Sequence, residues 1–530
     1  MSTESVKVYR IHPGIGIARL GNSREDDFYI GPEVPDFRFV PPPNGNYRNG
    51  QDQVRREGAR FRIYEYTYAD ASATQVESVR EITAQDAEIN WTVHLANLKS
   101  YYPTQQNRFP NDPGPKPISG INQRVEVAGA VGDVPVQLGT LRTDDAGRLV
   151  VLGGFGESGP FKDDAGEPNG IWNEGWYDDT SDGPVQAMLK LHGSGDTREA
   201  EPAWVITGVP PYATPTECVV TLYDLAYDLA IRQGLILPPA EVSFFNDIYP
   251  VLFRAVMSQW ASSVGRVGHG RGERGDFLDT QLFDLLKTNS TDPVPLQIRT
   301  GVFGKLKKPG GGGGNMPALS SLVVTPYQYE CFRKWAPGDF RPDWPTGYAP
   351  DNPPKPRPFD AMSPLEQTIA LDRAGLQSTV GGSFNPGIEG GSVMGTPIYE
   401  APFRIDRAQF PGTLTASLSI PWQADFRVCN ESWWPSARPG SVTKNGTNFY
   451  DWVPFAWSNR NMVEQWWKLG FLKGEESAGA PVYVERERLA EVPAGIALGE
   501  VPIPDEDLTT IKEAEAFVTR MVAAAVTRRQ

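Results

Sequence analysis

A carboxylate, a thiol and several indoles lie within one short stretch of the chain. The segment PWQADFRVCNESWWP holds Asp425 four residues before Cys429, with Trp422 on one side and Trp433 and Trp434 on the other. Side chains four residues apart share a face in a helix and also in a strand. A carboxylate near a thiol or an indole can accept a proton, and the three groups together can form a thioether-linked tryptophan quinone. The alternative is that the cysteine is a small core residue.

A second pair of tryptophans supplies candidates for the modified indole. The segment NMVEQWWKLGFLKG places Trp466 and Trp467 on an expected helix that ends at Gly470. Tryptophan beside cysteine is more often simple packing. These residue types alone therefore leave both the quinone and the packing interpretation open.

Histidine-based and metal-based chemistry has little support. The four histidines are His12, His94, His192 and His269. They form no HxH or HExxH pattern, which disfavours a zinc site and a Ser–His–Asp triad. The cysteines Cys218, Cys331 and Cys429 are too widely spaced for a disulfide framework or a set of zinc ligands. The opening GIGIARLG has Arg19 where a dinucleotide-binding loop needs its third glycine.

Composition limits the partners and the location. The 530 residues carry a net charge of −15, which argues against nucleic acid and anionic membranes as partners. The sequence has no apolar run of membrane-spanning length and no classical signal peptide, so we expect a cytoplasmic location or export without such a signal. With 54 Gly, 48 Pro and 14 Trp, the chain should have long ordered loops around an aromatic interior.

Two kinds of periodicity divide the chain. Up to about residue 208, short apolar alternations separated by turn residues predict antiparallel strands. TECVVTLYDLAYDLAIRQG then changes to helical spacing and stops at Gly234, and Ser363 before Pro364 marks the start of another helix. A last amphipathic helix is expected near the C-terminus. The sequence predicts an α+β fold, with a β-rich antiparallel N-terminal domain over 1–240 and a mixed helical, loop-rich, Trp-rich catalytic domain over 241–530.

Five separated motifs resemble the cysteine tryptophylquinone amino-acid oxidases, the LodA-like family typified by lysine ε-oxidase and glycine oxidase. In chain order they are YRIHPGIGIARLGNS, PPYATPTECVVTLYD, ALDRAGLQSTVGGSFNPGIEGG, PWQADFRVCNESWWPSARP and MVEQWWKLGF. The resemblance covers nearly the whole chain. It departs at Ser378 and Thr379, because family members often have a cysteine just before the paired glycines.

The resemblance implies a cofactor made from the chain's own side chains. The sulfur of Cys429 would be joined to the indole of Trp466, with Trp467 as the alternative, to give cysteine tryptophylquinone. Asp425 would be the acidic residue needed for cofactor formation and then for proton transfer. Lys444 would match a family lysine near the quinone.

The resemblance also suggests residues around the cofactor and the substrate. Trp422 would border the cofactor, and Gly381, Gly382 and Glu389 would form a wall of the active site. Glu389 and Arg438 would face the substrate, where an arginine can pair with a carboxylate through two hydrogen bonds. For Arg438, a structural salt bridge is an equal alternative.

The activity implied by the resemblance is that of a quinoprotein oxidase. Such an enzyme oxidatively deaminates a primary amine of an amino acid or a related metabolite with dioxygen, giving a carbonyl product, ammonia and hydrogen peroxide. A separate flavoprotein would oxygenate the tryptophan, and relatives suggest a homo-oligomer. Two alternatives remain: the same fold without a mature quinone, acting as a binding or structural protein, and a β-rich carbohydrate-binding protein with exposed tryptophans.

Overall fold

The computed structural model describes most of the chain. The described residues are 5–24, 26–37, 42, 45–69, 75–99, 109–169, 172–318, 322–381, 392–428, 437–453, 458–477 and 480–491. Cys429, Gly382 and Glu389 lie outside them, as do the tryptophans at 433 and 434 and the expected C-terminal helix.

Strands dominate the first 208 residues. They are β1 (Val6–His12), β2 (Ile15–Arg19), β3 (Phe28–Ile30), β4 (Arg56–Tyr68), β5 (Val76–Ile82), β6 (Ala87–Val93), β7 (Lys116–Ser119), β8 (Arg124–Val131), β9 (Val134–Thr143), β10 (Leu149–Gly153), β11 (Ser158–Pro160), β12 (Trp176–Asp178), β13 (Ser181–Leu191), β14 (Thr197–Glu199) and β15 (Ala203–Gly208).

Most of these strands join one large sheet. Its order is β7-β6-β13-β15-β2-β4-β10-β9-β8, with β1, β3 and β5 also paired to β4, and β14 paired to β13. Most neighbours are antiparallel, as the alternation predicted. Two pairs differ: β15 runs parallel to β2, with Trp204 opposite Ile15, and β3 runs parallel to β4. The β15–β2 pair joins segments far apart in the chain, so no local pattern could predict its direction.

Helices and short hairpins follow. The helices are α1 (Leu222–Arg232), α2 (Tyr249–Met257), α3 (Ser263–His269), α4 (Thr280–Leu286), α5 (Pro293–Gly304), α6 (Pro326–Trp335), α7 (Pro364–Gln377), α8 (Trp422–Val428) and α9 (Asn459–Gln465). The later strands form two-stranded antiparallel sheets: β16 (Tyr399–Ala401) with β17 (Arg404–Ile405), β18 (Ser441–Thr443) with β19 (Phe449–Asp451), and β20 (Phe471–Ser477) with β21 (Ala480–Arg486). The α+β class is confirmed.

Local chemistry explains where two of the predicted helices begin. The Ser363 hydroxyl accepts a hydrogen bond from the Glu366 amide, the Glu366 carboxylate accepts one from the Ser363 amide, and Pro364 occupies the first turn of α7. Thr221 and Asp224 cap α1 in the same reciprocal way. Such caps satisfy amides that have no partner inside the helix.

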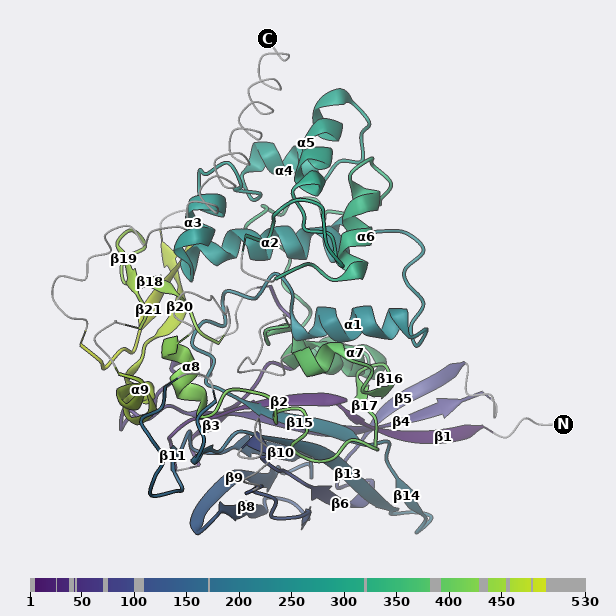
Figure 1. Cartoon of the computed structure of the whole chain (residues 1–530). Coiled ribbons are helices and arrows are strands. Elements are labelled where there is room, and N and C mark those ends of the chain that lie inside the picture. The colour runs from purple at the N-terminus through teal and green to yellow at the C-terminus, as the bar shows by residue number, and fades with distance from the viewer. Residues whose placement is uncertain are drawn as a thin grey trace.

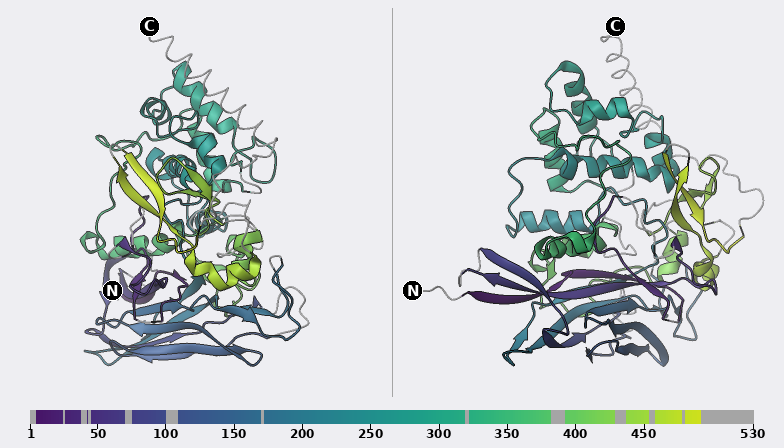
Figure 2. Two further views of the ribbon diagram at one scale, coloured as in Figure 1. Left: turned by 90° about the vertical axis from the view of Figure 1, so that its left-hand side faces the viewer. Right: turned by 180° about the vertical axis from the view of Figure 1, so that it is seen from behind.

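The helices stack on one face of the sheet. Figure 1 shows α7 lying on the sheet beside α1, with α2 to α6 farther from it. Helices α8 and α9 lie together at one end of the sheet, below the hairpins β18–β19 and β20–β21, and the two further views agree (Figure 2). The expected boundary near residue 240 falls between α1 and α2. Helix α7 packs on β2 across that boundary, where Gly375 lies against Ile17. The division into two domains stays a prediction.

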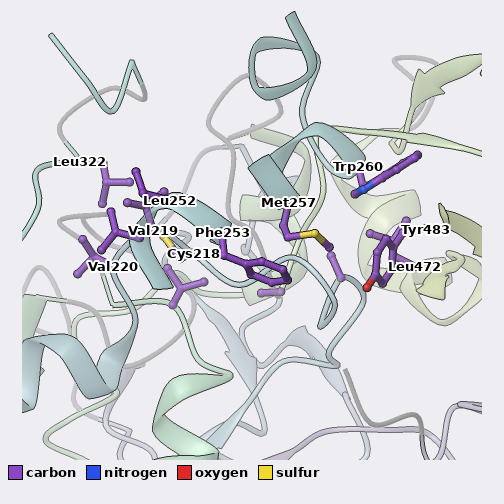
Figure 3. Packing of buried hydrophobic residues seen from close by; sticks show 14 of the residues in the cluster. Cys218, Val219, Val220, Leu252, Phe253, Met257, Trp260, Leu322, Leu472 and Tyr483 are labelled. Carbon is purple, nitrogen blue, oxygen red and sulfur yellow. The ribbon is translucent and has the colours of Figure 1, made fainter. Parts of the chain in front are cut away.

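Two cysteines belong to the apolar core between the helices. Cys218 lies in the same cluster as Leu252 and Phe253 (Figure 3), and Cys331 is buried there too. Neither forms a disulfide. Burial raises the pKa of both thiols to about 12, so they stay protonated and unreactive near neutral pH. Cys331, like Cys218, is therefore a core residue.

Candidate active site

An ion pair on the sheet side holds the segment that leads into α8. The Lys99 ammonium lies 2.9 Å from Oδ2 of Asp178 and 2.9 Å from the carbonyl oxygen of Ser419. Oδ2 of Asp178 also accepts a hydrogen bond from the backbone amide of Trp422, at 3.2 Å. Both charged side chains are about 1% exposed. The pair therefore fixes both ends of the turn from Ser419 to Trp422, where α8 begins.

Asp425 occupies the first turn of α8 and is buried. It is 1% exposed, and its Oδ2 accepts a hydrogen bond of 2.6 Å from the Ser419 hydroxyl. The ring of Phe426, one residue later, packs edge to face on Trp422 with centroids 5.1 Å apart. The carboxylate therefore sits in an aromatic, water-poor surrounding with at least one donor directed at it.

Trp466 packs against this helix. It begins a short 3-10 turn, Trp466–Lys468, directly after α9, and is 3% exposed. Its ring lies 5.3 Å from that of Trp422, centroid to centroid, at an interplanar angle of 64°. The Tyr212 hydroxyl donates to its carbonyl oxygen at 2.8 Å. Both the ring and the backbone of Trp466 are therefore held in place.

A glycine supports the indole from the other side. The indole N–H of Trp466 donates to the carbonyl oxygen of Gly156 at 3.0 Å, and the Gln423 side-chain amide donates to the same oxygen at 3.0 Å. Gly156 has a φ of +72°, and a Cβ there would lie 2.1 Å from Cζ2 of Trp466. Only glycine allows this contact, because the indole's six-membered ring rests directly on the backbone.

A second buried carboxyl supports the same loop, residues 154–157. Oδ2 of Asp179 accepts a hydrogen bond from the Glu157 amide at 3.0 Å and lies against Gly154. Its Oδ1 is buried with no hydrogen-bond partner among the described residues. Burial raises the pKa of Asp179 to about 8. Asp179 therefore holds its proton at neutral pH.

The neighbouring tryptophan has a different setting. The side chain of Trp467 is partly exposed, its N–H donates to the carbonyl oxygen of Glu464 at 3.2 Å, and the Lys468 ammonium lies 5.2 Å from its ring centre. These contacts stay within its own turn of chain. Of the two candidates, Trp466 is the one that the described contacts join to α8.

Other predicted site residues are placed less decisively. Lys444 is exposed on the β18–β19 hairpin, with its ammonium 5.6 Å from the centre of the Tyr450 ring. Arg438 is 1% exposed and donates to the carbonyl oxygens of Phe426, at 2.6 Å, and Pro439, at 2.9 Å. Both acceptors are backbone carbonyls, so these bonds test neither the substrate role nor the structural salt bridge. A place for Lys444 near the cofactor and a substrate role for Arg438 stay predictions.

Of the predicted wall residues and the thiol, only Gly381 belongs to the described residues. Gly381 is buried, its amide donates to the carbonyl oxygen of Val220, and a Cβ there would meet the backbone of Thr221 at 2.0 Å. Cys429 follows directly after Val428, the last residue of α8, and lies outside the described residues, as do Gly382 and Glu389. The roles assigned to these residues stay predictions.

Sequence reasoning missed several supporting residues. The glycines at 153, 154 and 156, at the end of β10 and just after it, were a readable sign of a close backbone approach. Lys99, Asp178 and Ser419 carried no such sign, since the lysine and the serine are 320 residues apart. Groups of three or more possible metal ligands are absent from the described residues.

Comparison with known proteins places the chain in a family. A family model described as "L-Lysine epsilon oxidase N-terminal" matches residues 12–111 and 101–207, and one described as "L-lysine epsilon oxidase C-terminal domain" matches residues 311–452. The chain belongs to the LodA-like family. The second match includes α8 and Asp425, and the first includes Lys99, Gly156 and Asp178, whereas Trp466 lies beyond both matches.

Relatives of this LodA-like chain extend the match. L-lysine 6-oxidase of Marinomonas mediterranea is 25% identical, over 83% of this chain and 74% of its own length. The solved ε-lysine oxidase of the same organism has a TM-score of 0.71 at 20% identity, covering 91% of this chain and 95% of that one. A structure described as the Schiff base intermediate of that enzyme with L-Lys has a TM-score of 0.69. These structures share the fold of this chain.

Proposed function

We propose that the protein is a quinoprotein oxidase that oxidatively deaminates a primary amine of an amino acid or a related metabolite. Dioxygen is the electron acceptor, and the products are a carbonyl compound, ammonia and hydrogen peroxide. Membership of the LodA-like family supports the reaction class. The observation that carries the proposal is the burial of Trp466 against α8, the helix that presents Asp425 and directly precedes Cys429.

We infer that Cys429 and Trp466 together form cysteine tryptophylquinone, with Trp467 as the less favoured alternative. The described residues fit such a group, because the indole is buried and its six-membered ring rests on Gly156, where no side chain intrudes. Such a quinone supplies an electrophilic carbonyl for the amine and accepts two electrons from it. A separate flavoprotein is the expected source of the oxygen atoms.

Asp425 is the proposed base. The proton on the carbon next to the substrate nitrogen would move to a carboxylate oxygen of Asp425, and the Ser419 hydroxyl would keep that carboxylate oriented. The rings of Trp422 and Phe426 exclude water around it, which strengthens electrostatic interactions inside the site. The ion pair of Lys99 and Asp178 holds the start of α8. Asp425 therefore keeps its position while the proton is transferred from the substrate.

The carbohydrate-binding alternative has no structural support in the described part of the chain. A stacking platform needs an exposed indole, and every tryptophan within the described ranges is buried or partly buried. The helices of the same ranges also include none that is long and apolar enough to cross a membrane. The absence of a mature quinone is a separate matter, which a mass measurement decides.

The test is the intact mass of the full chain coexpressed with its flavoprotein. A thioether and an ortho-quinone add two oxygen atoms and remove four hydrogen atoms, and the protein becomes coloured. Cys429→Ala should lose both the crosslink and the colour. An unshifted mass in the coexpressed wild type would contradict the proposed cofactor.

Peroxide release identifies the amine. The panel begins with L-lysine, which the name of the M. mediterranea relative specifies for that enzyme, and continues with glycine, other amino acids and their amine derivatives. A mature, coloured protein that releases no peroxide with any primary amine would contradict the oxidase activity while leaving the cofactor intact.

A further inference from the structure

One buried hydrogen-bond donor beside Trp466 has no acceptor within the part of the chain that the structure describes. Nε1 of Trp422 is inaccessible to solvent and has no hydrogen-bond partner among the described residues. Buried donors nearly always find an acceptor, because leaving one unpaired forfeits its hydrogen bond to water. An orphan N–H in a closely packed site therefore needs an explanation.

Six other buried tryptophans among the described residues follow the ordinary rule. Each of the following donates its indole N–H to a carbonyl or carboxylate oxygen at 2.9–3.0 Å: Trp91, Trp176, Trp204, Trp335, Trp452 and Trp466. The fold can therefore supply acceptors to indoles, and Trp422 stands apart from this group.

The position of Trp422 is firmly determined. Its backbone amide donates to Asp178, its ring packs on Phe426 at 5.1 Å, and it meets Trp466 at 5.3 Å between centroids. A side chain whose backbone is fixed and whose ring packs against two other rings cannot turn toward an acceptor elsewhere. Whatever satisfies its N–H has to arrive at Trp422.

Maturation of Trp466 would bring new acceptors to this place. An ortho-quinone of tryptophan carries two carbonyl oxygens on the six-membered ring, and each can accept a hydrogen bond. The two ring centroids are 5.3 Å apart at an interplanar angle of 64°, so oxygens added to the ring of Trp466 would belong to the immediate surroundings of Trp422, whose N–H is the donor without an acceptor among the described residues.

We propose that the indole N–H of Trp422 donates a hydrogen bond to a quinone oxygen carried by the mature Trp466. The inference rests on the proposed function, since it needs the quinone. It assigns Trp422 a direct contact with the cofactor, in which the N–H draws electron density toward that oxygen. In the unmodified chain the N–H of Trp422 has no acceptor among the described residues. Maturation of Trp466 would add that acceptor.

The experiment is resonance Raman spectroscopy of the mature full chain in H2O and D2O. The carbonyl stretch that receives the bond should shift to lower frequency in D2O in the wild type. In Trp422→Phe, which keeps an aromatic ring but removes the N–H, that stretch should rise in frequency and lose its sensitivity to D2O. Trp452→Phe is the matched control, because Trp452 is equally buried but its N–H is already bound to Gly470.

The outcomes separate this inference from the proposed function. A wild-type mass without added oxygen removes both. A mature wild type whose carbonyl stretches ignore D2O overturns only the hydrogen bond, and so does a mature Trp422→Phe with unchanged carbonyl frequencies. If Trp422→Phe does not mature, the D2O shift of the wild type alone decides.

Discussion

The hydroxyl of Ser419 lies 2.6 Å from Oδ2 of Asp425, with both residues buried. Lys99 donates a hydrogen bond to the carbonyl oxygen of Ser419, and the hydroxyl of the same serine donates to the proposed base. Ser419 therefore connects the Lys99–Asp178 ion pair to Asp425. A hydrogen bond to an ionised carboxylate is stronger than one between neutral groups. Its removal should therefore be measurable.

Ser419→Ala should alter the pH dependence of the oxidase. A carboxylate that loses a donor binds its proton more tightly, so the acidic limb of kcat/KM should move to higher pH by roughly one unit. Ser441→Ala is the control, because the Ser441 hydroxyl is also buried but has no hydrogen-bond partner among the described residues. An acidic limb that stays in place in Ser419→Ala would remove this serine from the control of Asp425.

Gly156→Ala should disrupt the packing of Trp466. The new Cβ would lie 2.1 Å from Cζ2 of the indole in a backbone with φ of +72°, so we expect a loss of roughly 3 kcal/mol in the free energy of unfolding. Gly195→Ala is matched in backbone, with φ of +74° and nothing within 4 Å, and should cost only about 1 kcal/mol. Urea unfolding of the unmodified chain gives both values. Equal losses would show that the indole does not rest on Gly156.

Trp466→Phe and Trp467→Phe should separate the two candidate indoles. Trp466 is joined to Gly156 and Trp422, whereas Trp467 contacts its own turn. After coexpression with the flavoprotein, Trp466→Phe should be colourless with an unshifted mass, and Trp467→Phe should keep the colour. The reverse result would move the quinone to Trp467.

Asp179→Asn should stabilise the protein at alkaline pH. Burial raises the pKa of Asp179 to about 8, so the folded chain holds a proton that the unfolded chain has released above about pH 4. The wild type therefore loses stability as pH rises from about 4 to about 8, by up to about 5 kcal/mol. Asparagine resembles the neutral acid and carries no such proton.

Calorimetry at two pH values checks this sign. The Tm of Asp179→Asn should exceed that of the wild type at pH 9, and the difference should shrink at pH 5. Asp163→Asn, which changes an exposed loop residue, is the control. A difference that grows toward acid pH would mean that Asp179 is ionised in the folded protein.

Much of the local structure could be predicted from short stretches of sequence. Ser363, Pro364 and Glu366 lie within four residues of one another, and their chemistry alone starts α7. Alternating apolar residues likewise predicted strands such as β6, in which every second residue is buried. The parallel pairing of β15 with β2 was not predictable, since it depends on contacts between distant segments.

The sequence by itself determined which residue types are available to the site: a thiol four residues after a carboxylate, and two adjacent indoles downstream. Its motifs also indicated the LodA-like family and, through it, the chemistry expected of these residues. Only the tertiary structure decided which indole is buried and on what it rests. Trp466 meets Gly156 across 310 residues and Lys99 reaches Ser419 across 320. Such contacts form because the whole core excludes water at once, and no short stretch of chain carries that information.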